Sequence, residues 1–208
     1  MSGTGLAKLN LAVRKGATVR LPIRIETSEL TWVNITGITR DAPVTITAPS
    51  HECPDGWNVA IVGVKGMSEL NIDAGLKDRD FRRAAVTTTD DIQLNNVDSS
   101  SFKAYKSGGH IAFYAPIDLS AYATARMEVK DKVGGTQLLL LLTSSGGLEI
   151  DSAANTLWIN MTAAESAALD FSGGVFDIEL VTAGGLVKAV CSSESVLTVD
   201  SEVTTSGG

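Results

Sequence analysis

The stretch "TVRLPIRIE", residues 18–26, decides the fold class of this chain. Its apolar residues fall on one face of an extended backbone and its polar residues on the other: the apolar ones are Val19, Leu21, Ile23 and Ile25. A period of two is typical of a β-strand that buries one face. Pro22 has no amide proton for a ladder, so we expect this strand at a sheet edge or locally broken.

The same alternation returns in "ATARMEVKD" (residues 123–131) and "VFDIELV" (175–181). We expect inward-facing Ala125, Met127 and Val129 in the first, and Phe176, Ile178 and Leu180 in the second. Between such runs lie the turn signals "VGG", "SSGG", "SGG" and "AGG". The sequence therefore predicts an all-β fold, a sandwich or barrel of short, mainly antiparallel strands.

Two further segments have distinct patterns. The run "LLLLL", residues 138–142, is far too short to cross a bilayer and is interpreted as a buried strand. In "NMTAAESAAL", residues 160–169, Thr162 and Glu165 have the spacing of a capping box. We therefore expect one short helix of one or two turns there, as a crossover between the edges of the sandwich.

The middle of the chain has shorter strands, denser turn residues and a charge cluster, which is typical of a separate small barrel. The strand at 17–26 then lacks a local partner unless it pairs with strands after residue 115. We expect a discontinuous β-sandwich, residues 1–34 and 115–208, with a small β-barrel inserted at 35–114. Two domains in series are the alternative.

Composition restricts the partners. The chain has 17 Lys and Arg against 24 Asp and Glu, a formal net charge of −7, which disfavours nucleic acid and anionic membrane surfaces. The N-terminus has early charges and no long apolar run, so a cleaved signal peptide is not expected. Cys53 and Cys191 are interpreted as ordinary reduced thiols, because they are far apart and two histidines cannot complete a metal site.

Few residues could carry chemistry. His51, Glu52, Cys53 and Asp55 invite a Cys–His or metal interpretation, but the prolines and glycine around them favour a solvated β-turn. His110 is interpreted as a side chain at the start of a strand. Asp78 and Asp80 are spaced for a cation, and the neighbouring arginines favour a charged loop instead. These arginines are Arg79, Arg82 and Arg83.

No hydrolase, nucleotide-binding or metalloprotease motif occurs, so we expect no enzymatic activity and no cofactor, metal or catalytic residue. Trp32, Trp57 and Trp158 lie in separate segments and are expected to pack in the core or at edges rather than to form a stacking platform.

Residues 35–71 and 81–109 resemble a small β-barrel module of tailed-phage virion proteins, itself similar to the first catalytic cysteine half-domain of ubiquitin-activating enzymes. The shared features are His51 before an Asp55–Gly56 turn, "VKGMSELN" at 64–71 and a closing "FKAYKSGG" at 102–109. The chain departs from this pattern at Glu52, where glycine commonly follows the histidine. We expect Gly63 and Gly66 to permit tight turns, Met67 and Leu70 to fill the core, and Asn71 to cap a turn.

Residues 15–26 and 116–204 resemble the immunoglobulin-like N-terminal module of phage baseplate and tail-fibre-associated proteins. The two resemblances imply an immunoglobulin-like β-sandwich with an inserted small β-barrel and one short helix. They imply a virion structural protein, an adaptor or fibre-anchoring subunit of the tail, baseplate or head–tail connector. Its expected partners are other virion proteins and further copies of itself, assembled in the host cytoplasm.

Two other functions remain open at this point. One is a receptor- or carbohydrate-binding module of a tail fibre, which exposed aromatic side chains beside carboxylates would favour. The other is a hydrolase that works through Cys53 and His51, for which we expect no activity that a Cys53→Ala substitution could abolish.

Overall fold

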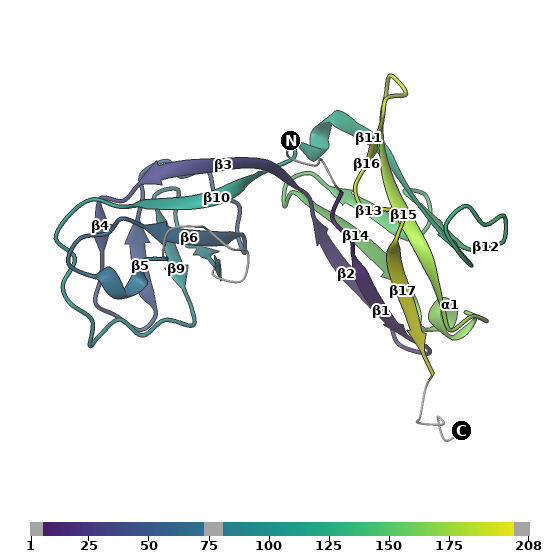
Figure 1. Ribbon diagram of the computed structural model, residues 1–208, viewed down its shortest axis with the longest axis horizontal. Coiled ribbons are helices and arrows are strands. Elements are labelled where there is room, and N and C mark those ends of the chain that lie inside the picture. Colours follow the sequence, from purple (N-terminus) through teal and green to yellow (C-terminus); the bar gives the residue numbers. More distant parts are fainter. Residues whose placement is uncertain (1–5, 73–80, 202–208) are drawn as a thin grey trace. The chain divides into compact units, whose positions relative to one another are not determined.

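The computed structural model describes residues 6–72 and 81–201 of the 208-residue chain. This part is mostly β, as the alternating pattern predicts (Figure 1). The chain divides into two compact units. Unit 1 contains Met1–Ile25 and Asp118–Gly208, and unit 2 contains Glu26–Ile117.

The boundaries of these units differ from the expected ones at both junctions. The sequence places residues 26–34 and 115–117 with the discontinuous domain, whereas they lie in unit 2. The reason is strand pairing: β3 (Glu26–Asn34) runs antiparallel to β10 (His110–Pro116) from Asn34↔His110 to Glu26↔Pro116.

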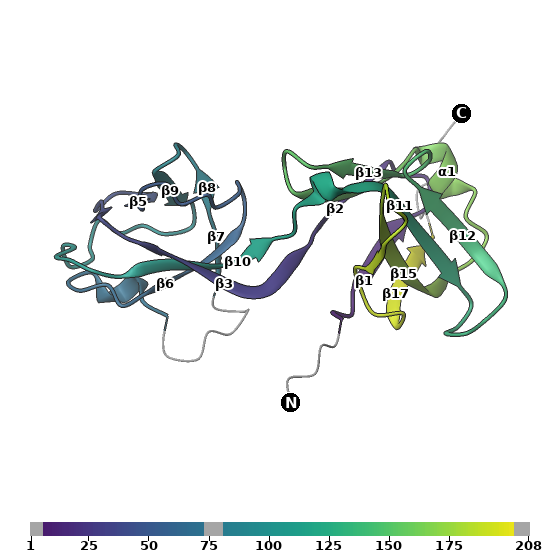
Figure 2. The same cartoon turned by 90° about the horizontal axis from the view of Figure 1, so that it is seen from above.

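In the described part of unit 1, the strands form a six-stranded and a three-stranded sheet (Figure 2). The larger sheet has the order β1-β17-β15-β11-β12, and β16 pairs with β15; the smaller has the order β13-β14-β2. β1 and β17 are parallel, and the other pairs are antiparallel. The elements are β1 (Asn10–Arg14), β2 (Val19–Arg24), η3 (Leu119–Ala121), β11 (Tyr122–Lys130), β12 (Leu138–Thr143), β13 (Leu148–Asp151), β14 (Thr156–Met161), α1 (Ala163–Ala167), β15 (Gly173–Thr182), β16 (Val187–Ala189) and β17 (Ser195–Asp200).

The predicted inward faces of β11 and β15 are confirmed, since all six apolar side chains are buried. In the first strand Val19, Ile23 and Ile25 are buried and Leu21 is half-buried. β2 is an edge strand and pairs with β14, where Trp158 lies opposite Pro22. Both expectations for this strand, an edge position and a partner beyond residue 115, are therefore confirmed.

The interpretation of "LLLLL" as a buried strand is wrong. β12 is an edge strand of the larger sheet, with Leu138 49% and Leu141 50% exposed. Leu142 of the same strand points to the other face of the sheet, where it is buried opposite Met127. An unbroken apolar run does not reveal whether both faces of the strand are covered. In β12 the face that carries Leu138 and Leu141 is not covered.

The predicted short helix is confirmed as α1, of five residues. Thr162 caps it, and both bonds of the capping box are present: Glu165 N–H donates to the Thr162 hydroxyl, and Thr162 N–H donates to the Glu165 carboxylate. The Thr162 N–H and the Thr162 hydroxyl both donate to the Glu165 carboxylate, and these two bonds lower the pKa of Glu165. α1 connects β14 to β15 and so leads the chain from the smaller sheet to the larger one.

The described part of unit 2 contains two four-stranded sheets, with the orders β3-β10-β6-β7 and β4-β5-β9-β8. They enclose one cluster of buried side chains that includes Trp57, Ile46, Ile92 and Phe113. The remaining elements are β4 (Gly37–Ile38), β5 (Val44–Thr47), β6 (Asn58–Val62), η1 (Ser68–Leu70), β7 (Arg82–Arg83), β8 (Ala85–Val86) and β9 (Asp91–Leu94).

The segment "VKGMSELN" closes one side of this cluster. Met67 and Leu70 are fully buried in it, as expected. Gly66 has φ +96°, and a Cβ added there would lie 2.2 Å from the Ala104 carbonyl oxygen, so only glycine fits. Asn71 binds both backbone groups of Val64: its Oδ1 accepts from the Val64 N–H at 2.8 Å, and its Nδ2 donates to the Val64 carbonyl at 3.0 Å.

Replacing Asn71 by Ala tests this closure. Asn71→Ala leaves a partly buried N–H and C=O of Val64 without their partners, so we expect the free energy of unfolding to fall by about 1–3 kcal/mol. Urea denaturation measures it, with Asn96→Ala, in an exposed turn, as the control. A loss for Asn71→Ala no larger than that of the control contradicts the closing role.

Candidate functional site

The interpretation of residues 51–55 as a solvated turn is right for Glu52 and Asp55, which are exposed, with Asp55 and Gly56 in a turn. It is wrong for His51 and Cys53, which are 2% and 4% exposed. His51 Nδ1 accepts from the Cys53 N–H at 3.0 Å, and Nε2 lies 3.2 Å from the Thr88 carbonyl oxygen. The first bond needs an unprotonated Nδ1 and the second a proton on Nε2. Both ring nitrogens are therefore engaged with the backbone.

The thiol of Cys53 is not prepared for nucleophilic chemistry. Burial, and to a smaller extent the carboxylate of Asp55, raises the pKa of Cys53 to about 12. The Sγ lies 3.6 Å from the Pro54 carbonyl oxygen. Asp55 itself accepts from the Val86 N–H at 2.9 Å and so holds β8. A Cys–His pair activates its thiol by lowering the pKa, and here the shift has the opposite sign.

The charged candidates at residues 78–83 are only partly visible. Asp78, Arg79 and Asp80 lie outside the described residues. Arg82 and Arg83 form β7, where they pair with Val59 and Asn58 of β6. Within residues 6–72 and 81–201, no three His, Cys, Asp or Glu side chains gather as a metal site would require.

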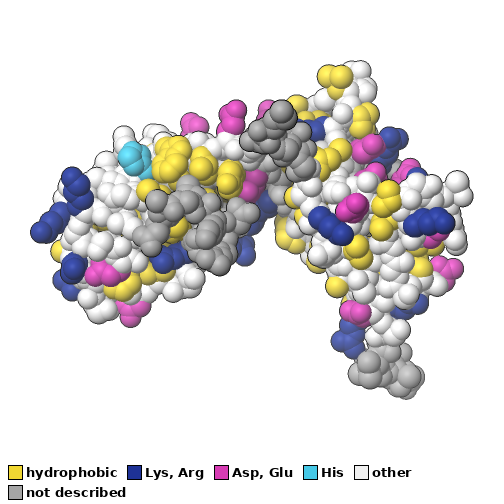
Figure 3. Space-filling view, viewed as in Figure 1, with side chains coloured by type: hydrophobic (Ala, Val, Ile, Leu, Met, Phe, Trp, Pro, Cys, Tyr) yellow, Lys and Arg dark blue, Asp and Glu magenta, His cyan; other side chains and the backbone are white. Residues whose placement is uncertain are grey.

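Aromatic side chains far apart in the sequence meet on the outer face of the β3-β10-β6 sheet. His110 begins β10, as predicted, and its exposed ring lies edge-on to Trp32 of β3 at a centroid distance of 6.1 Å. Phe81 stacks on Tyr114 at 5.7 Å. We call these four side chains the aromatic face of unit 2. Figure 3 shows hydrophobic side chains gathered beside a histidine on this unit.

The three tryptophans therefore play three different roles. Trp57 is fully buried, and its indole N–H donates to the Tyr114 carbonyl at 2.8 Å. Trp158 is half-buried beneath Arg20, whose guanidinium carbon lies 4.2 Å from the ring centroid. Trp32 lies on β3, an edge strand, where it packs against His110 and stays 49% exposed, so its expected place at an edge is confirmed. The alternation of residues 110, 112 and 114 places His110 and Tyr114 on one face of a strand. The sequence does not show that this strand pairs with β3, and so it does not predict that Trp32 lies beside His110.

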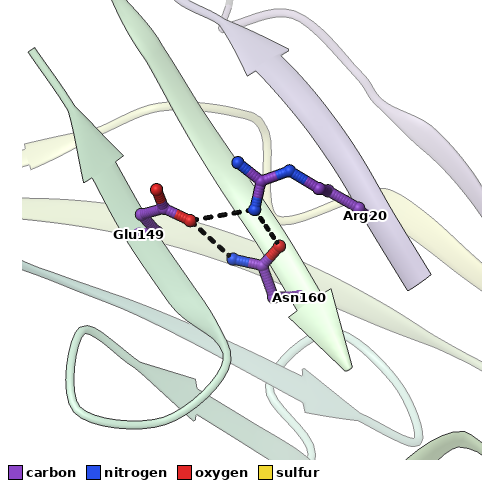
Figure 4. Close-up of polar contacts among 3 residues, drawn as sticks. All are labelled: Arg20, Glu149 and Asn160. Atoms are coloured by element: carbon purple, nitrogen blue, oxygen red, sulfur yellow. Dashed lines mark hydrogen bonds and ion pairs between the residues drawn. The ribbon is translucent and has the colours of Figure 1, made fainter. Parts of the chain in front are cut away.

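A polar cluster lies on the smaller sheet of unit 1, where Arg20 of β2, Glu149 of β13 and Asn160 of β14 converge (Figure 4). Arg20 Nη1 lies 3.0 Å from Glu149 Oε2 and 2.9 Å from Asn160 Oδ1, and Asn160 Nδ2 donates to Glu149 at 3.1 Å. Each of the three side chains therefore contacts the other two. It ties three strands together and, since Arg20 and Glu149 are about half exposed, its contribution to stability is small.

The exposed face of the larger sheet is charged. Arg126 pairs with Glu179, and Lys130 lies 3.0 Å from Glu128. Asp177 of β15 lies directly opposite Glu128 of β11, which places like charges across a ladder. The pKa of Asp177 is raised, first by partial burial and then by the negative charges of Glu179 and Glu128. The positive charges of Lys130 and Arg126 oppose this rise.

Thiol labelling tests the protected corner. With a pKa of about 12, the Cys53 thiolate is about a thousandfold scarcer near neutral pH than that of an unperturbed thiol. We therefore expect iodoacetamide at pH 8 to leave Cys53 unmodified in the folded protein and to alkylate it in urea, as followed by mass spectrometry of tryptic peptides. Labelling of folded Cys53 at the rate of a free cysteine contradicts this reading of the corner.

A substitution at Asp177 tests the charged face. Because the folded state raises the pKa of this carboxyl, its ionisation destabilises the fold, and the loss develops as pH rises from about 4 through the folded-state pKa. We expect Asp177→Asn to stabilise the protein at pH 7 by a few tenths of a kcal/mol, roughly the value of one cross-strand charge contact, and to have no effect at pH 3. Thermal melts at both pH values measure it.

Asp170→Asn is the control, since Asp170 is exposed in the segment before β15. A gain for Asp177→Asn that is as large at pH 3 as at pH 7 contradicts the electrostatic cause.

Comparisons with known proteins give no family for this chain: no protein-family model matches the sequence, and no curated protein matches it significantly. In the described residues, no helix has the length and apolar character needed to cross a membrane. A proposal for function therefore has to start from the strand order and from the surfaces described above.

Proposed function

We propose that this chain is a structural protein of a tailed-phage virion, an adaptor or fibre-anchoring subunit of the tail, baseplate or head–tail junction. It acts by multivalent docking to other virion proteins and to further copies of itself. The observation that carries the proposal is the strand order of unit 1, interrupted between β2 and β11 by the whole of unit 2. This is the layout implied by the two sequence resemblances.

The strand order of unit 1 supports an immunoglobulin-like sandwich. Immunoglobulin-like domains place strands B, E and D in one sheet and strands G, F and C in the other, and variable-type domains add C′ beside C. β2, β14 and β13 correspond to B, E and D; β17, β15, β11 and β12 correspond to G, F, C and C′. Unit 2 then occupies the loop between B and C, where an insertion disturbs no ladder.

Local geometry in unit 2 supports the small-barrel module. Glu52 stands where that module commonly has glycine after the histidine, and its φ is +51°, in the left-handed region that glycine adopts freely. Gly66 and Asn71 of the shared "VKGMSELN" segment have the closing roles described above. The residues that carry the resemblance thus have backbone and packing roles, which is typical of a structural module.

Docking also agrees with the chemistry of the surfaces. The Cys53 thiol, whose pKa is raised to about 12, is protonated and buried. The net charge of −7 disfavours nucleic acid as a partner. Copies held in a symmetric assembly face one another at high effective concentration, so that contacts too weak for an isolated pair become sufficient.

The aromatic face of unit 2 favours one second candidate, a receptor- or carbohydrate-binding module of a tail fibre. Trp32 exposes half of its surface beside the imidazole of His110, and an exposed indole ring offers the flat apolar surface on which a sugar ring stacks. One exposed indole beside an imidazole is a smaller basis than the strand order of unit 1, so the docking role remains the leading proposal.

The proposal is tested on purified particles of the phage that encodes the chain. We expect mass spectrometry to find the protein in the mature particle at a fixed stoichiometry, and cryo-electron microscopy to place it in the tail, baseplate or connector. Particles that lack the protein contradict the structural role.

The second candidate is tested with the purified protein on a glycan array. If it is correct, Trp32→Ala weakens binding at least about tenfold, whereas Tyr122→Ala, an aromatic substitution on unit 1, does not. If the docking proposal is correct, neither the protein nor its variants bind glycans, and Trp32→Ala is still incorporated into particles.

A further inference from the structure

Nearly all the edge strands in the described part of the chain carry the residues by which proteins block unwanted strand pairing. Some contain charged residues or proline: Arg14 in β1, Arg20, Pro22 and Arg24 in β2, Glu26 and Glu29 in β3, Arg82 and Arg83 in β7, Glu149 and Asp151 in β13, and Lys188 in β16. The others, β4 and β8, are two residues long. β12 has the sequence LLLLLT and has none of these features.

The open side of β12 presents both apolar side chains and backbone groups. Leu138 and Leu141 are about half exposed. The Ser144 N–H donates to the Ala125 carbonyl of β11. The Thr143 N–H points away from β11 and donates to the Gly146 carbonyl. Because backbone groups alternate along an antiparallel strand, those of Leu142 face β11 and those of Leu141 face the open edge.

We propose that β12 is the strand through which two copies of this chain pair, antiparallel and about a two-fold axis. A second copy is the occupant that the charge pattern favours. β12 paired with itself sets leucine against leucine, whereas pairing it with any longer edge strand described here sets a charged residue beside an uncharged apolar strand. Pairing joins two larger sheets into one continuous sheet.

The geometry of β12 also limits the strength of this contact. Its register against β11 shifts between Leu138 and Leu140, so Leu139 is an extra residue and the regular edge is short. We therefore expect a weak dimer of the isolated chain that becomes effective in an assembly of many copies. The biological meaning of the contact rests on the proposed function, whereas the pairing itself is a property of the purified protein.

The test is the sedimentation of the full chain from about 5 µM to about 500 µM, a range that covers weak self-association. We expect the average mass of the wild type to rise towards that of a dimer. Leu141→Lys places a charge at the edge, and Leu141→Pro removes an outward N–H without removing a bond to β11. Both variants should remain monomeric across the range.

Leu186→Lys is the matched control, because Leu186 is 75% exposed next to β16 and does not lie on β12. It should associate as the wild type does. Hydrogen exchange adds a direct readout: protection of the Leu141 amide should rise with protein concentration in the wild type and in Leu186→Lys.

A wild type that stays monomeric throughout the range overturns the proposal. So does association that survives in folded Leu141→Lys, with circular dichroism as the check on folding. Neither outcome affects the proposed virion role, which is judged by the presence of the protein in particles. Conversely, dimerisation through β12 in a protein absent from particles leaves the pairing intact and removes the virion role.

Discussion

The pairing of β2 with β14 is the interaction on which the rest of unit 1 depends. Its six residue pairs run from Arg24↔Thr156 to Val19↔Met161, and unit 2 lies between the two strands in the sequence. The entropic cost of closing a loop grows only slowly with its length, so a long insertion is tolerated here. If unit 2 folds by itself, the connection to be closed is shorter still, because the ends of that unit, β3 and β10, are paired with each other.

The parts of the fold that the sequence predicts correctly are those that depend on local residues and not on the pairing of distant strands. The alternation in β2, β11 and β15 reports a single buried face and needs no knowledge of the partner strand. Pro22 marked an edge because a missing amide proton is a local property. Whether a strand such as β12 is covered depends on residues elsewhere in the chain, so the leucine run was misread. β1 escaped prediction because five residues held parallel to β17 have no strong local pattern.

The same distinction applies to the candidate sites. The turn residues around His51 predicted a corner correctly but not the burial of His51 and Cys53, which involves distant parts of the chain such as Thr88. The aromatic face requires the register between β3 and β10, which brings together side chains 78 positions apart, Trp32 and His110. Glu52 shows the reverse case. Its left-handed backbone costs about 1 kcal/mol for a residue with a Cβ and is tolerated where the bonds of His51 hold the corner on both sides.

The charge distribution on the larger sheet favours the proposed association at its edge over association at its face. The exposed face carries Arg126, Glu128, Asp177 and Glu179, whose partial pairing in water would be lost if a second protein covered them. Burying such charges without new partners is unfavourable, and it would raise further the pKa of Asp177. The edge at β12 has no charge to desolvate. A subunit built in this way can extend its sheet sideways while its faces stay hydrated, and in a symmetric assembly that geometry limits where the next copy can bind.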